Sequence, residues 1–167
     1  MSDEASARLA LPFLAAGQAQ KEMTVNEALA RLDAAVQACA VAGGLDEPPA
    51  APAPGQCWIV GTAPTGDWTG QANALAAWTG DGWRFVAPVE GMAVWVAADA
   101  LCWRWRDGGW VAGDLSGRRV SIDGIAVVGP QAAAIADPDG GAVVDGEART
   151  AIAAILAALR SHGLIAA

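Results

Sequence analysis

All eight tryptophans of this 167-residue chain lie in its middle third, and their spacing repeats. Trp78 and Trp83 flank one short turn, and Trp105 and Trp110 flank a second. The turns contain Asp-Gly and Gly-Gly, which tolerate the positive φ of tight hairpins, so each segment is predicted to be a β-hairpin. A Gly-led strand with a tryptophan precedes each hairpin. Two copies of such a unit predict a small antiparallel sheet or a partly closed barrel.

A helix is predicted before this region. Thr24-Val25-Asn26-Glu27 has the form of a capping box, which predicts a helix that begins at Thr24. Gly43-Gly44 is predicted to end it, as glycine does after a C-cap. Apolar residues follow at alternating four- and three-residue steps, which is the a/d pattern of a coiled-coil contact. This seam predicts oligomerisation and comprises Val25, Leu29, Leu32, Val36 and Cys39.

A second helix is predicted at the end of the chain. Asp145 is a candidate N-cap, and Glu147 suits the positive first turn. Gly163 is predicted at C′, with Leu164 touching Leu159 across a Schellman turn. The other faces are mostly alanine, which favours close approach between copies. The apolar stripe assigned to oligomerisation comprises Ile152, Ile155, Leu156 and Leu159.

These elements predict an α+β protein. It has an N-terminal helix, a small antiparallel Trp-rich β domain of two hairpin repeats, and a C-terminal helix that bundles on oligomerisation. We predict an N-terminal arm and helix at 1–42, a Pro-rich linker at 43–54, the β domain at 55–128, and a linker with the oligomerisation helix at 129–167.

Charge limits the partners. Acidic residues outnumber basic ones 18 to 10, for a formal net charge of −8. Phosphate contacts need clustered Lys and Arg, so no nucleic-acid partner is expected. The acidic start and the short, Pro-broken apolar run after it resemble neither a secretory signal nor a membrane span. We therefore expect assembly in the cytoplasm and no membrane insertion.

Catalytic chemistry is not expected. The three cysteines, Cys39, Cys57 and Cys102, have neither metal nor disulfide spacing. His162, the one histidine, suits the C-terminal dipole of the second helix. Six carboxylates are candidates for a glycosidase pair, but Asp81 and Asp107 suit turns, Glu90 precedes a strand, and none has an apolar setting that would raise a pKa. They are Asp67, Asp81, Glu90, Asp99, Asp107 and Asp114. No enzyme, metal or cofactor is predicted.

The tryptophans leave three interpretations open. Trp58 and Trp95, beside β-branched neighbours, are predicted to be core. The turn-flanking residues Trp78, Trp83, Trp105 and Trp110 are candidates for core packing, for stacking on a glycan ring, or for a protein interface. The absence of tyrosine weakens the glycan interpretation.

Two segments carry a resemblance to known proteins. "LPFLAAGQAQKEMTVNEALARLDAAVQ" resembles the N-terminal signature of a domain family of unassigned activity. That family occurs on fibre or spike proteins of tailed phages and gene transfer agents. The tail from Val128 to Ile165 is similar to the ends of phage fibre and head-fibre proteins.

The resemblance implies a homo-oligomeric virion protein, released by lysis, that serves as a head-spike or fibre base in host attachment. Its implied partners are capsid or tail proteins, a longer fibre and host surface polysaccharide. A tail-fibre adaptor and a free-standing carbohydrate-binding module remain alternatives.

Overall fold

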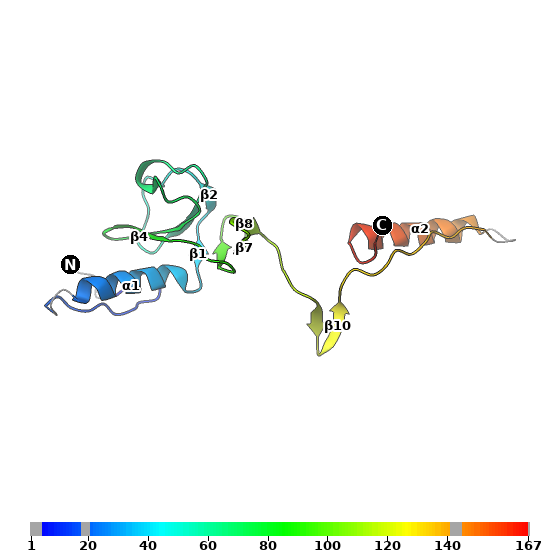
Figure 1. Ribbon diagram of the computed structural model, residues 1–167, viewed down its shortest axis with the longest axis horizontal. Coiled ribbons are helices and arrows are strands. Elements are labelled where there is room, and N and C mark those ends of the chain that lie inside the picture. The colour runs from blue at the N-terminus through cyan, green and yellow to red at the C-terminus, as the bar shows by residue number, and fades with distance from the viewer. Residues whose placement is uncertain (1–4, 18–20, 141–144, 167) are drawn as a thin grey trace. The chain divides into compact units, whose positions relative to one another are not determined.

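The structure is a computed structural model that describes residues 5–17, 21–140 and 145–166. It has two compact units, Met1–Asp114 and Leu115–Ala167 (Figure 1). The predicted α+β class is confirmed. The first unit contains α1 (Lys21–Ala35), β1 (Cys39–Ala40), β2 (Gly43–Leu45), β3 (Cys57–Val60), a 3-10 turn (Gly66–Trp68), β4 (Leu75–Thr79), β5 (Gly82–Val86), β6 (Ala93–Val96), β7 (Leu101–Arg106) and β8 (Gly109–Ala112). The second contains β9 (Val120–Ile122), β10 (Ile125–Val128) and α2 (Gly146–Ser161).

The sequence repeat becomes two similar four-stranded sheets. One has the order β2-β3-β4-β5 and the other the order β1-β6-β7-β8. In each, the last three strands form an antiparallel meander that ends in a tryptophan hairpin. The remaining edge strand, β2 or β1, runs parallel to its neighbour. The two repeats therefore have the same topology as well as the same residue spacing.

The parallel edge strands come from residues 38–45, which were predicted to form the end of the first helix and the start of the linker. The N–H of Val41 donates to the Cys57 carbonyl at 2.7 Å, and the N–H of Trp95 donates to the Ala38 carbonyl at 2.9 Å. Residues 38–45 thus pair with both β3 and β6. The predicted helix end at Gly43-Gly44 was wrong, because α1 ends at Ala35 and Gly43 begins β2. A Cβ on Gly43 would lie 2.9 Å from the Trp103 ring, so glycine here permits close packing.

The start of α1 also differs from the prediction. The helix begins at Lys21, so Thr24 lies inside it and is not its N-cap. Residues 18–20, where a cap would fall, lie outside the described residues. The Glu27 carboxylate does not close a capping box but pairs with two guanidinium groups. Nε of Arg84 lies 2.5 Å away and Nε of Arg31 lies 3.0 Å away.

The first unit has two hydrophobic clusters. One comprises Ala34, Ala38, Ala40, Cys57, Ile59, Leu75, Ala77, Val94 and Val96. The other comprises Trp58, Val60, Trp68 and Ala76, with Trp78, Trp83 and Phe85 packed against it. Trp58 is buried, as predicted. The core assignment of Trp95 was wrong, since Val94 and Val96 are buried on one face of β6 and strand alternation exposes Trp95 on the other.

Backbone motifs order the ends of α2 in the second unit. The Asp145 carboxylate accepts the N–H of Ala148, which confirms the predicted N-cap. Gly163 has a φ of 69°, its N–H donates to the Arg160 carbonyl, and the N–H of Leu164 donates to the Leu159 carbonyl. These two bonds are the predicted Schellman motif. Within the part of the chain that the structure describes, no helix is long and apolar enough to cross a membrane.

Candidate functional site

The two tryptophan hairpins have matching geometry. Trp78 lies directly opposite Trp83, with ring centroids 5.0 Å apart, and Trp105 lies opposite Trp110 at 5.5 Å. Both pairs are edge-to-face, the arrangement that the aromatic quadrupole favours. The loop of the second hairpin, Asp107-Gly108, has positive φ at both residues, as type I′ turns do. The predicted hairpins are confirmed.

The first pair is built into a larger aromatic cluster. Trp83 contacts not only Trp78 but also Trp58 and Trp68, at centroid distances of 5.6 and 5.2 Å. All three contacts are edge-to-face. Trp83 is therefore the centre of four packed indoles, although part of its own ring stays accessible.

The second pair joins the two sheets. Nε1 of Trp110 donates to the carbonyl of Asn73 at 2.8 Å, and Asn73 lies in the loop before β4. Trp105 packs on Trp110 and is half-buried. All four candidate tryptophans are thus half-buried: each contributes to packing and keeps a partly accessible ring. Their role in binding a glycan or a partner stays a prediction.

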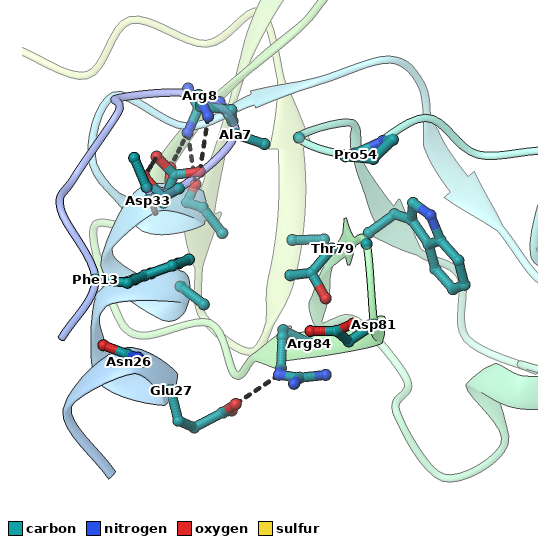
Figure 2. A pocket seen from close by; sticks show the side chains of 18 of the residues that line it. Ala7, Arg8, Phe13, Asn26, Glu27, Asp33, Pro54, Thr79, Asp81 and Arg84 are labelled. Atoms are coloured by element: carbon teal, nitrogen blue, oxygen red, sulfur yellow. Dashed lines mark hydrogen bonds and ion pairs between the residues drawn. The ribbon is translucent and has the colours of Figure 1, made fainter. Parts of the chain in front are cut away.

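A cavity of about 710 Å³ opens beside the first hairpin, between that hairpin, α1 and the N-terminal arm (Figure 2). Trp78, Thr79, Asp81 and Arg84 line it on the hairpin side. Across from them, α1 contributes Glu27, and the Arg84–Glu27 ion pair joins the two walls. The cavity lies on the face of the hairpin that carries Arg84, whereas the indoles of Trp78 and Trp83 pack in the aromatic cluster on the opposite face.

The arm that forms the third wall is bound to α1 through the side chains of Asp33 and Asn26, among others. The buried Asp33 carboxylate accepts three hydrogen bonds, from Oγ of Ser6 at 2.7 Å and from the N–H groups of Arg8 and Leu9 at 3.0 and 2.6 Å. The Asn26 amide exchanges two bonds with the backbone of Leu14, at 2.8 and 3.1 Å. Asn26 and Asp33 are seven residues apart and so share a face of α1.

Arg8 supplies the C-terminal cap of α1. Its guanidinium donates to the carbonyls of Asp33, Ala34 at 3.3 Å and Gln37 at 2.9 Å. These carbonyls belong to the last turn of the helix and its exit, which have no partner within the helix. A cation at this end also suits the helix dipole. Sequence reasoning missed this cap because Arg8 is remote from the helix end in the chain.

The polar lining of the cavity can both donate and accept. Arg84 uses Nε for Glu27 and Nη1 for the Trp83 carbonyl, at 3.1 Å. The Thr79 hydroxyl donates to the carbonyl of Gly82 at 2.7 Å and still has acceptor capacity. A pocket lined by Phe13 of the arm and by a few polar groups suits a small ligand that has one apolar face. A sugar ring is such a ligand.

Three of the carboxylates weighed for hydrolysis, Glu90, Asp107 and Asp114, lie around the end of β7, and Asp99 lies apart from them. Asp99 accepts the indole N–H of Trp103 at 2.9 Å, Asp114 pairs with Arg106 at 3.1 Å, and Glu90 accepts the N–H of Asp107 at 3.2 Å. His162 is the C-cap of α2. Among the described residues, no three His, Cys, Asp or Glu side chains gather into a potential metal site. Burial raises the pKa of the Cys57 thiol to about 11.

The predicted oligomerisation residues divide by exposure. The predicted seam is only partly helical, because Val25, Leu29 and Leu32 lie on α1 whereas Val36 follows its last residue and Cys39 lies in β1. Val25, Leu32 and Val36 are exposed and Leu29 is half-buried. On α2, Ile152 and Ile155 are exposed, whereas Leu159 is half-buried and Leu156 is buried within its own unit. Oligomerisation itself stays a prediction.

The first unit is thus an α+β module of two tryptophan-hairpin repeats. Its N-terminal arm is hydrogen-bonded to α1, and a cavity lies beside one hairpin. The chain belongs to DUF2793, a family of proteins of unknown function, whose model matches residues 25–111. The match runs from α1 into β8 and covers both repeats. No curated protein matches the chain.

Proposed function

We propose that the protein is a structural component of a phage-like particle such as a gene transfer agent, where it forms a homo-oligomeric head-spike or fibre base. It would contact capsid or tail proteins, carry a longer fibre and contribute to attachment to the host surface. The resemblance of the Leu11–Gln37 segment to phage fibre and spike proteins supports this assignment. Its localisation would be the virion.

The exposed seam of α1 is the observation that carries the proposal. The arm and the β4–β5 hairpin cover one side of this helix, with Asp33 and Ala34 buried there. The seam faces elsewhere: Val25 and Leu32 on α1 remain 39% and 50% exposed, and Val36, directly after the helix, remains 46% exposed. A regular apolar seam left open on a folded module is typical of a helix that packs on another chain.

Host contact would use the partly accessible tryptophans. Stacking on one aromatic ring contributes about 1 kcal/mol by analogy with aromatic pairs. A single copy would therefore bind a surface polysaccharide weakly, and many copies on one particle would supply avidity. The cavity, with Phe13, Thr79 and Arg84 in its lining, also supports the alternative of a free-standing carbohydrate-binding module, which predicts tight sugar binding by the monomer.

A map of the particle with this chain labelled tests the proposal directly. We expect density for it at a capsid vertex or at the tail, and absence of that density in particles that lack its gene. Position on the tail would favour the tail-fibre adaptor. Purified particles without the protein at any position would overturn the proposal.

The seam can be tested on the purified full chain. Leu32→Asp is expected to lower the oligomeric mass, because it places a charge in a packed contact. Thr24→Asp, on an exposed part of α1 outside the seam, is the matched control. A monomeric parent, or equal masses for both variants and the parent, would show that the seam is not an interface.

A further inference from the structure

The β9–β10 hairpin has one strongly apolar face. Ile122 pairs with Ile125 and Val120 pairs with Val128, so each pair lies on one side of the two-stranded ribbon. Val127 shares that side with Ile125 by strand alternation. All five side chains are β-branched and exposed: Val120 54%, Ile122 58%, Ile125 69%, Val127 52% and Val128 45%. Ser121 lies on the other face.

A β-bulge makes this face continuous. The register shifts between Ala126 and Val128, so one extra residue is inserted opposite Val120. Without the shift, Val128 would alternate to the face of Ser121. The bulge thus gathers on one face the apolar side chains that strict alternation would divide between two. The turn, Asp123-Gly124, has positive φ at both residues and fixes this register.

The apolar face of the β9–β10 ribbon is not buried by any other part of its own unit that the structure describes. A single two-stranded ribbon is at best marginally stable in water without packing on one face. Among the described residues of the second unit, only Leu156 and Ile165 are buried, and neither belongs to the ribbon. The five exposed side chains form the kind of contiguous apolar patch that marks an interaction surface.

The charge distribution favours another copy of the same unit as the partner that covers this face. Residues 115–167 carry four arginines and five carboxylates, a formal net charge of −1. Residues 1–114 carry six basic and thirteen acidic residues, a net charge of −7, so like charge opposes contact between copies less in the second unit than in the first. The ribbon itself has both signs, with Arg118 and Arg119 at its open end and Asp123 at its turn.

We propose that the apolar face of the β9–β10 ribbon is a self-association surface that packs against the same face of a second copy of this chain. This interface is separate from the α1 seam and does not depend on a role in a virion. It gives the second unit the core that a single chain lacks. Assembly would therefore bury Val120, Ile122, Ile125 and Val128 between copies.

Two neighbouring substitutions test the proposal on the full chain. Ile122→Asp and Ser121→Asp add the same charge to the same strand on opposite faces, and both parent residues are exposed. Ile122→Asp is expected to weaken self-association by roughly 30-fold or more, as loss of a central interface anchor does. Ser121→Asp should leave it nearly unchanged. Sedimentation equilibrium across a concentration series measures both.

Disulfide trapping distinguishes contact between copies from misfolding of the variant. In a Cys39→Ser, Cys102→Ser background, Ile125→Cys is expected to form a covalent dimer on mild oxidation, and Ser121→Cys should not. A monomeric parent would overturn both this proposal and the α1 interface. An oligomeric parent that Ile122→Asp leaves intact, with no trapped dimer, would overturn this proposal alone.

Discussion

The two units of the chain place their large apolar side chains differently. In the first unit, Trp68, Ile59 and Leu75 are wholly buried. The two sheets also contact each other there, because β1 of one sheet lies against β3 of the other. In the second unit, Leu115, Ile125 and Ile155 are at least 60% exposed. The first unit therefore has its own core, whereas the second is ordered by local backbone motifs and by hydrogen bonds between residues 131–140 and the α2 region.

This difference in burial indicates which unit has enough buried apolar surface to fold without a partner chain. A tight turn, an N-cap and a Schellman motif each contribute about 1 kcal/mol or less, and none replaces a core. We infer that the first unit folds cooperatively in one chain. The second unit, with the same apolar content but little internal burial, gains its stability by association.

The largest effect is expected in the core of the first unit. Trp68→Ala removes a wholly buried indole that packs on Trp83, and should lower the free energy of unfolding by about 3–5 kcal/mol. Ile155→Ala, in the second unit, removes an exposed side chain and should change the unfolding of the first unit by less than about 0.5 kcal/mol. Urea denaturation followed by tryptophan fluorescence reports on the first unit, which holds all eight tryptophans. Equal effects would mean that the two units unfold as one.

A smaller loss is expected where the arm joins α1. Asp33→Ala leaves the Ser6 hydroxyl and two backbone N–H groups without their acceptor, at a cost of about 2–4 kcal/mol after partial rehydration. Asp67→Ala, at an exposed position of the 3-10 turn, is the control. Denaturation gives the stability, and limited proteolysis should cut the arm sooner in the Asp33 variant. An arm that stays protected would show that Arg8 alone is enough to hold it.

Local signals in the sequence predicted the two tryptophan hairpins and both ends of α2 correctly. The Trp-turn-Trp spacing located both hairpins, and Asp145 and Gly163 located the ends of α2. Each of these features depends on residues a few positions apart, so a short window of sequence contains the whole physical cause.

The errors arose where distant residues decide the structure. Gly43 resembles a helix stop, but the Trp103 ring sixty residues away requires glycine there. Glu27 resembles half of a capping box, but Arg84 pairs with it across the cavity. Trp95 has β-branched neighbours, yet those neighbours take the buried face of β6. The cavity walls come from three separate segments, so no local pattern predicted them.

Thiol chemistry sharpens the contrast within the first unit. Burial raises the pKa of Cys57 from 9.0 to about 11, whereas Cys39 is exposed. At pH 8 the thiolate fraction of Cys57 is about 100-fold below that of an ordinary thiol, and access is blocked as well. Alkylation followed by mass spectrometry should label Cys39 readily and Cys57 only on unfolding. The same shift makes stability fall as pH rises from about 9 to 11, because the unfolded chain loses this proton first. Rapid labelling of Cys57 in the native protein would show that the core opens locally.

The smallest effects are expected at the two ends of α2. Alanine substitutions there should change the stability of the helix in opposite directions, which tests the role of backbone motifs in ordering the second unit. Gly163 has a φ of 69° and open space where a Cβ would lie, so Gly163→Ala carries only a conformational cost of about 1 kcal/mol. Gly146 also has open space but no positive φ at the first helical position. Gly146→Ala should therefore stabilise the helix by about 0.5 kcal/mol, because alanine reduces the freedom of the unfolded chain. Circular dichroism at 222 nm during thermal melting compares the two variants with the parent. Since both substitutions add the same methyl group in open space, a loss of helix in both would mean that packing against another chain, and not backbone geometry, decides the ends of α2.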